Sequence, residues 1–482
     1  MTQELTRRLA AAADDMPAAR VPSDLFRRGR RRHRLQMSTF AIFAIVLAFA
    51  ASIALSGVDG AVVPASGTST VPGRLHEPWP WQASVAGSPR GPAALLVSGG
   101  GGYQAMDLPF TYGSRISAIG RDGSYRVLPF GTTYLQAGQD VLLSPDGRYA
   151  AGNGTYERLL GTGDTDVSIV DLTTGEERRH QGSGPAVPVA WSHDGRRLLV
   201  HRFGASSWSD TPFDGADTTG SDNGALWLLD VGSGAATHLL DLGRTRRGAA
   251  AFSPDGRTVA VQLGRELALL DSATGTRRPL ATLPAGAHLG GPWSYTADGT
   301  GLGVLTIADG CTTGCSNAAR NARSWRLTVL STTTGTELPT TFPTFGGATA
   351  RLAGWQRDGT AVLVRYTDET NGGEPSDDPP AAYRAVSDAD LLALTPGGTT
   401  KSLLTKPKGV IWDVDVATDL VTAGAFGGPS PAPSVFPLAR WAATTVFVAL
   451  WALAMLTWLT ITLRRRTRRR PPLRPAAHPG AR

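Results

Sequence analysis

The chain has 482 residues and a formal net charge of +7, with 58 Gly, 33 Pro and an aromatic share of only 7%. This composition favours short strands joined by tight turns over a helical fold. Nine Arg and four acids precede Gln36, and eight Arg and no acids follow Leu463, so the part between them carries about −6. Because nucleic-acid binding needs basic residues on the folded domain, we expect no nucleic-acid partner.

An Arg-rich segment, 1–36, is followed by the apolar run Met37–Leu55. Its nineteen uncharged residues can cross a hydrocarbon core of about 30 Å at about 1.5 Å per residue. The small residues Ala51, Ser52 and Ala54 resemble an export cleavage region, so a cleaved signal peptide is the alternative. The preceding segment is long for a signal peptide, and we therefore expect an uncleaved membrane helix.

A second apolar run, Trp441–Leu463, has 23 residues without a charge and predicts a second membrane helix. Residues 56–82 and 426–440 read as linkers, and 464–482 as an Arg/Pro-rich tail. Arginines flank both runs on their outer sides, and such clusters stay in the cytoplasm. We therefore expect a two-pass plasma-membrane protein with both termini cytoplasmic and residues 56–440 outside. The flanking clusters contain Arg30, Arg31 and Arg32 before the first run and Arg464, Arg465 and Arg466 after the second.

Between the two runs a unit recurs, with its clearest copy at Phe252–Gly275. An apolar stretch, an Asp-Gly turn and a second apolar stretch predict a hairpin, because Asp bonds its own backbone and Gly supplies a positive φ. A third strand, a turn at Gly275 and a fourth strand complete the unit. The later Gly turn recurs at Gly175, Gly234, Gly335 and Gly397. The Asp-Gly turns are Asp146-Gly147, Asp194-Gly195, Asp255-Gly256, Asp298-Gly299 and Asp358-Gly359.

A degenerate copy precedes these five, with Ser84–Val97 as its first hairpin and Ile116–Leu128 as its second. Val410–Ala423 adds two further strands. Four-stranded units of this length match the blades of a β-propeller, which need neighbours to bury both faces. We therefore predict an all-β propeller of six four-stranded blades plus a partial or complete seventh, over residues 83–425.

Three of the turns, LSPDGR at 143–148, WSHDGR at 191–196 and FSPDGR at 252–257, resemble the WD40-like repeats of TolB-type propellers. The chain lacks the Gly-His and regular Trp-Asp signature of true WD40 proteins. The resemblance to TolB-type propellers covers residues 83–425 and implies fold more than function. The shortage of Lys relative to Arg is typical of a GC-rich bacterial genome. The outline of residues 1–36 resembles the short cytoplasmic heads of actinobacterial membrane proteins linked to sigma-factor control.

Three units are longer than the others between their second and third strands, at Ser206–Asn223, Asp309–Ala322 and Asp368–Ala385. Because strands alternate in direction, all three insertions should lie on one face, where we expect a protein or cell-envelope partner to bind. If the chain enters a first strand and leaves after a second, both connections join this same face and the partner is membrane-proximal. Calcium binding is an alternative role for the clustered carboxylates of the first insertion, Asp210, Asp214, Asp217 and Asp222.

Cys311 and Cys315 are the only cysteines, and in an oxidising compartment they should form a local disulfide. Two thiols do not supply the four ligands of a structural zinc site, so we expect no metal and no cofactor.

The sequence contains no Gly-x-Ser-x-Gly elbow, no phosphate-binding loop and no His-Glu-x-x-His. A catalytic site built from several blades would leave no contiguous motif, so an enzyme acting on envelope glycans remains an alternative. A signalling protein of anti-sigma type, reporting through residues 1–36, is another. We favour a non-enzymatic binding scaffold or sensor.

Overall fold

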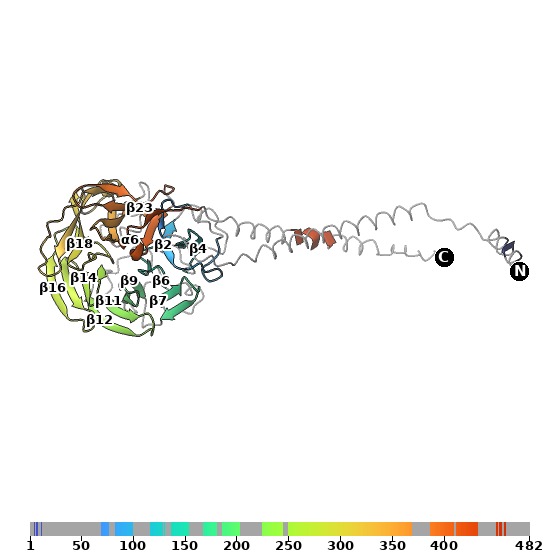
Figure 1. The fold of residues 1–482 in the computed structure, drawn as a ribbon, viewed down its shortest axis with the longest axis horizontal. Helices are drawn as coiled ribbons and strands as arrows, with labels where there is room; N and C mark the ends of the chain where they lie inside the picture. The colour runs from blue at the N-terminus through green and yellow to red at the C-terminus, as the bar shows by residue number, and fades with distance from the viewer. Residues whose placement is uncertain are drawn as a thin grey trace, which may run out of the picture. The chain divides into compact units, whose positions relative to one another are not determined.

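The computed structural model describes residues 69–76, 82–99, 116–128, 130, 136–153, 167–180, 186–202, 224–243, 249–368, 386–408 and 411–431, and short helical pieces near the two ends. The chain divides into two compact units, one formed by Val62–Leu438 and the other by the two ends. The described residues of the first unit form six four-stranded antiparallel sheets arranged as a ring (Figure 1). They are the blades of a β-propeller, as the repeats predict.

The first strand of each sheet is its inner strand in the ring, and the first strands of blades 1 to 4 contact one another in succession. The outermost strands of blades 2, 4 and 6 are largely exposed, whereas that of blade 1 is buried. Blade 2 contains β5 (Val141–Leu143), β6 (Tyr149–Asn153), β7 (Val167–Asp171) and β8 (Glu177–His180). Blade 3 contains β9 (Ala186–Trp191), β10 (Arg197–Arg202), β11 (Gly224–Asp230) and β12 (Ala236–Gly243). Blade 4 contains β13 (Ala250–Phe252), β14 (Thr258–Leu263), β15 (Glu266–Asp271) and β16 (Arg277–Thr282).

The last two complete blades follow the same order. Blade 5 contains β17 (Ala287–Leu289), β18 (Gly301–Asp309), β19 (Ser324–Ser331) and β20 (Phe345–Gly346), with helix α4 (Asn317–Asn321) between β18 and β19. Blade 6 contains β21 (Thr349–Trp355), β22 (Ala361–Asp368), β23 (Val386–Leu394) and β24 (Thr400–Ser402).

Blade 1 is assembled from both ends of the domain. Its order is β25 (Ile411–Val416), β2 (Ala93–Gly99), β3 (Ser117–Gly120) and β4 (Tyr125–Val127). In Figure 1 the blue strand β2 therefore lies beside the orange C-terminal strands. The expectation of a partial seventh blade is wrong, because the strand assigned to it is the inner strand of blade 1.

The predicted hairpin Ser84–Val97 is also wrong. Its second half is β2, but residues 83–85 run beside the outer strand β4, where Ser84 forms a parallel bridge with Val127. The chain then turns back to start β2. The following hairpin, Ile116–Leu128, is present as β3 and β4. The residues after β25 form helix α6 (Thr418–Thr422) and β26 (Phe426–Gly428).

The Asp-Gly turns share a hydrogen-bonded pattern that fixes the first hairpin of blades 2 to 5. In blade 4 the Ser253 hydroxyl donates to Asp255 at 2.6 Å and accepts from the N–H of Thr258 at 2.9 Å. Asp255 also accepts from the N–H of Arg257 at 3.0 Å. These hydrogen bonds lower the pKa of Asp255, and the turn glycines of both kinds have φ between 67° and 83°.

The turns define two faces of the ring. We call the ends that carry the Asp-Gly turns the turn face, and the ends that carry the loops between second and third strands the insertion face. β25 ends and β2 begins on the turn face, where the N–H of Ala93 donates to Gly147 O at 2.8 Å and the N–H of Ala417 to Ala94 O at 3.0 Å. The expectation that the chain enters a first strand and leaves after a second is therefore wrong, and the two connections join the face opposite the insertions.

The two connections leave the ring side by side. β1 (Val71–Pro72) pairs in parallel with β26, and the N–H of Gly73 donates to Gly428 O at 3.0 Å. The apolar residues at the closure form one buried cluster that joins blades 6, 1 and 2. Paired strands and shared core thus seal the ring at the point where its two ends meet.

The predicted membrane segment Met37–Leu55, the Arg clusters and residues 464–482 lie outside the described residues. Seven residues of Trp441–Leu463 are described, and all seven are helical and exposed. Within the described parts of the chain, no helix is both long enough and apolar enough to span a membrane.

Candidate binding face

The insertions separate the second and third strands of blades 3, 5 and 6, as predicted. The first insertion, Ser206–Asn223, and residues 369–385 of the third lie outside the described residues, and so do the candidate calcium ligands Asp210, Asp214, Asp217 and Asp222. The insertion of blade 5 is described completely. No cluster of three metal-ligating side chains occurs among the residues that the structure describes.

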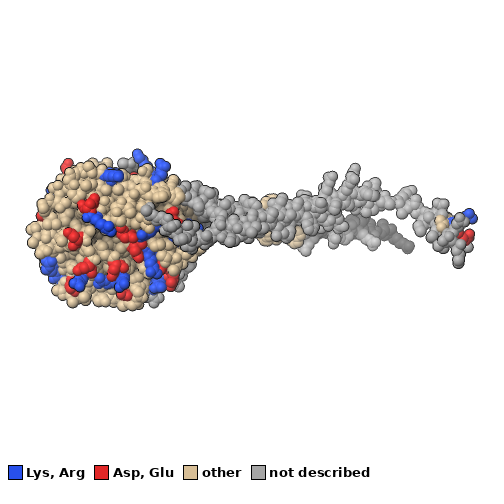
Figure 2. Space-filling view, viewed as in Figure 1, with Lys and Arg blue, Asp and Glu red and all other residues tan. Residues whose placement is uncertain are grey.

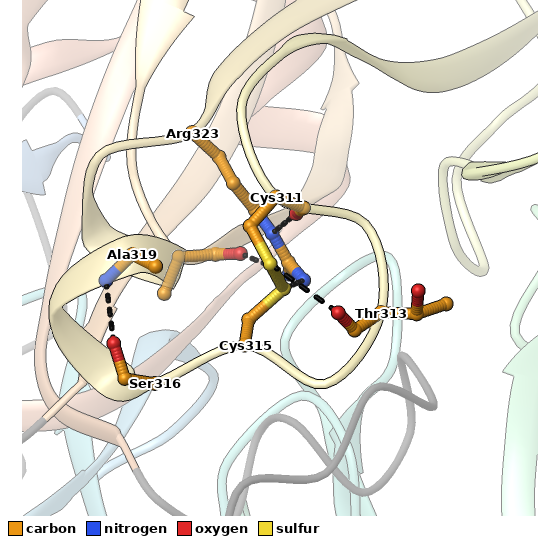
Figure 3. The surroundings of a disulfide bond; sticks show 7 residues. Cys311, Thr313, Cys315, Ser316, Ala319 and Arg323 are labelled. Atoms are coloured by element: carbon orange, nitrogen blue, oxygen red, sulfur yellow. Dashed lines mark hydrogen bonds between the residues drawn. A yellow bond between two sulfur atoms is a disulfide. The ribbon is translucent and has the colours of Figure 1, made fainter.

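The blade 5 insertion is a short loop closed by a disulfide and followed by helix α4. Cys311 and Cys315 are bonded, with their Cα atoms 5.9 Å apart. The Ser316 hydroxyl caps α4 by accepting from the N–H of Ala319 at 3.3 Å. Figure 3 shows the disulfide beside the first turn of the helix. The loop and the helix therefore form one small structural unit on the insertion face.

Arg323 lies under this unit and joins it to the propeller. Its side chain is buried, and Nε donates to Cys311 O at 2.7 Å while Nη1 donates to Ala348 O at 3.2 Å (Figure 3). Nη2 lies 3.3 Å from Cys315 Sγ. One guanidinium thus contacts both half-cystines and the chain segment that leads into blade 6.

Helix α4 is bound directly to the end of β22. Arg320 and Asp368 form an ion pair of 2.7 Å, and both side chains have no exposed area. Asn321 exchanges two hydrogen bonds with the backbone of Asp368, at 3.1 and 2.8 Å. Burial raises the pKa of the Asp368 carboxyl to about 6 although the guanidinium opposes the shift. The third insertion starts at Asp368. The ion pair and hydrogen bonds of Asp368 therefore connect the start of the third insertion to helix α4 of the blade 5 insertion.

The tip of the loop remains exposed while its base is fixed. Thr312, Thr313 and Gly314 are exposed, whereas Cys315 is only 1% exposed. A surface loop with a rigid base can present its tip to a partner at a low cost in conformational entropy. The sequence predicted the disulfide but not the two arginines, because no spacing indicates that they meet residues of the next blade.

A second polar cluster, at the ring closure, was not predicted. Arg351 on β21 is buried and lies 3.1 Å from Asp413 and 3.6 Å from Asp415, both on the inner strand of blade 1. Tyr366 accepts from Arg351 Nε and donates to Asp413, each at 2.7 Å. Its signal was the alternation of aspartates in Ile411–Val416, which puts both on one side of an otherwise apolar strand.

The closure cluster joins three blades. The amide of Gln139 donates to Asp413 at 2.6 Å, and the N–H of Leu143 donates to Asp415 at 2.7 Å. Burial raises the pKa of both aspartates, that of Asp415 to about 6. The carboxylate oxygens thus contact protein donors at a buried position, an arrangement that suits a structural clamp better than a catalytic pair.

The remaining predicted site residues are the turn residues, and they lie together on the turn face. These are Asp146, Gly147, Asp194, Gly195, Asp255, Gly256, Asp298, Gly299, Asp358 and Gly359. Figure 2 shows basic and acidic side chains interspersed over the propeller face in view.

No protein-family model and no curated protein matches the chain. Solved structures are similar to it in fold. An oligogalacturonate lyase in complex with manganese is 16% identical over 61% of this chain and 71% of that chain, with a TM-score of 0.41. TolB from Acinetobacter baumannii is 14% identical over 60% and 65%, with a TM-score of 0.33. An acylaminoacyl peptidase is 13% identical over 60% and 41%, with a TM-score of 0.36. These similarities concern the propeller fold alone.

Proposed function

We propose that the chain is a membrane-anchored, extracytoplasmic binding module whose insertion face engages a protein or cell-envelope partner. The observation that carries this proposal is the construction of the blade 5 insertion. A disulfide, a capped helix and a buried ion pair fix its base, and its tip, Thr312–Gly314, is exposed. Such a loop binds with less ordering cost than a free one.

We favour binding over catalysis because the carboxylates of the closure cluster are buried and contact only groups of the protein itself among the described residues. Asp413 and Asp415 contact Arg351, Tyr366 and backbone or amide donors, and neither is exposed to solvent. A general acid or base must instead reach a substrate. The closure cluster therefore stabilises the closed ring, and we assign binding to the insertion face.

Two features support the membrane anchor and the extracytoplasmic location. Leu450, Trp451, Leu453, Met455 and Trp458 are helical and between 42% and 64% exposed, and a row of large apolar side chains needs an apolar surrounding such as lipid. The disulfide fits an oxidising compartment. Cysteines introduced singly at Thr333 and Arg474 test this topology. An impermeant maleimide should label the first in intact cells and the second only after lysis.

A pair of photo-crosslinking variants tests the binding face. A benzophenone amino acid at Thr313 should give a discrete adduct in intact cells, because this residue is exposed at the tip of the insertion. The matched control is Thr333, which is exposed on the same blade in the turn between β19 and the next strand, on the turn face. Equal adducts from both positions, or none from either, would contradict the proposal.

A further inference from the structure

A crevice opens on the turn face between blades 1 and 2. It has a volume of about 220 Å³ including the solvent at its mouth. The loop before β2 contributes Arg90, the turn between β3 and β4 contributes Ser124, and β4 contributes Arg126, while Leu172 closes the side formed by blade 2. The crevice thus brings together two guanidinium groups from different segments of the chain.

Two neutral carbonyl groups among the described residues hold Arg126 in place. Its side chain is 9% exposed, and Nε donates to Ser88 O at 2.8 Å while Nη1 donates to Tyr125 O at 2.7 Å. Its third nitrogen, Nη2, has no hydrogen bond to any residue that the structure describes. The nearby carboxylate of Asp122 accepts from the N–H and the hydroxyl of Ser124, at 2.9 and 2.6 Å.

Arg90 adds a second positive charge to the crevice. It is exposed, and among the described residues no carboxylate pairs with it or with Arg126. Burial and the neighbouring Arg90 lower the pKa of Arg126, and the nearby Asp122 carboxylate opposes this shift. By contrast, two other buried arginines each form an ion pair, Arg320 with Asp368 and Arg351 with Asp413.

A buried guanidinium beside a like charge is costly unless an anion neutralises it. We propose that this crevice is an oxyanion site that binds the terminal phosphate group of a ligand. A guanidinium fork matches phosphate oxygens, and the charge of about −1.5 to −2 on a phosphate monoester at pH 7 matches two arginines. The enclosed part of the crevice is smaller than a phosphate group, so the phosphate contacts the two arginines at the open mouth and the rest of the ligand lies outside. The site lies opposite the insertion face and is independent of the function proposed above.

Titration of inorganic phosphate into the full-length chain at low ionic strength, followed by calorimetry, tests the site. We expect saturable binding of one phosphate. Arg90→Gln should weaken the affinity at least about tenfold, because a hydrogen bond to a charged group is lost while an exposed side chain leaves the fold intact. Arg126→Lys, which keeps the charge and loses the fork, should also weaken it.

Arg257→Gln is the matched control, because Arg257 is exposed on the same face in the Asp-Gly turn of blade 4. It should leave the dissociation constant unchanged. No saturable binding at millimolar phosphate, or an equal loss in the control, overturns the proposal. Soluble dihexanoyl phosphatidic acid, whose phosphate is a terminal monoester, distinguishes the source of the phosphate. Tighter binding of this lipid than of inorganic phosphate, lost in Arg90→Gln, assigns the site to a lipid headgroup, and the reverse order assigns it to a free phosphate or a soluble phosphomonoester.

Discussion

Replacing Arg351 by Met would leave two buried carboxylates at the ring closure without their counter-ion. Methionine keeps much of the side-chain length, so the change removes mainly the charge and the donors. The lost contacts are the ion pairs of 3.1 and 3.6 Å with Asp413 and Asp415 and the 2.7 Å hydrogen bond to Tyr366. Breaking a buried pair by removing one partner typically costs about 3–5 kcal/mol, and we expect a loss of that size at pH 7.

The loss should become smaller in acid. Burial already raises the pKa of both aspartates, that of Asp415 to about 6, and without Arg351 their pKa values should rise further. At pH 5 the variant can therefore protonate them and avoid part of the cost. Urea unfolding of both proteins at pH 7 and pH 5 measures the difference. The double variant Arg351→Met/Asp413→Asn should recover part of the stability at pH 7.

Two results would refute this reasoning. A loss below about 1 kcal/mol at pH 7 would mean that the cluster is solvated or dispensable. An equal loss at both pH values would mean that the cost does not come from unpaired carboxylates.

Three further predictions concern the turns and the insertion. Gly147→Ala places a Cβ 2.0 Å from a backbone oxygen of blade 1 and should cost more than about 3 kcal/mol, whereas Gly264→Ala, with a similar φ and open space, should cost only about 1–2 kcal/mol in the same unfolding assay. Asp368 has a raised pKa, so the stability it contributes is fully present below about pH 4 and is lost as the pH rises through about 6. The unfolding free energy of the wild type minus that of Asp368→Asn should therefore fall between pH 4 and 7, and a constant difference would contradict the assignment. Replacing Cys311 and Cys315 by Ser opens a five-residue loop and should cost about 2 kcal/mol locally, seen as faster hydrogen exchange in α4 with little change in β9–β16.

The sequence predicted those parts of the fold that repeat. Each Asp-Gly turn between two apolar stretches gave a correct hairpin, because the turn chemistry and the strand pattern agree locally. Blade 1 was misassigned because its strands come from opposite ends of the domain. Pairing between β25 and β2 is a long-range property, and the Pro and Gly residues at 89–92 mimic a hairpin turn that the structure does not form.

The positions of the insertions and the disulfide were predicted from the sequence, but the buried contacts that hold the blade 5 insertion in place were not. The lengths between turns located the insertions, and the short cysteine spacing gave the disulfide. Arg320 reaches Asp368 across a sequence separation that varies with loop length, so no spacing rule could identify the pair. The closure cluster was not predicted, and the charged residues within the apolar strands β21 and β25 are the only sequence signal that could have indicated it.

Because blade 1 combines strands from both ends of the domain, it can be completed only late in translation. β2 cannot gain its inner neighbour until β25 has been made, about 320 residues later. At roughly 5–20 residues per second, the inner edge of β2 waits about 15 to 65 s for its partner. During that time it is an unpaired strand edge that other nascent chains can join. A chain truncated before Ile411 lacks β25, so the inner edge of its β2 stays unpaired. We therefore expect such fragments to aggregate.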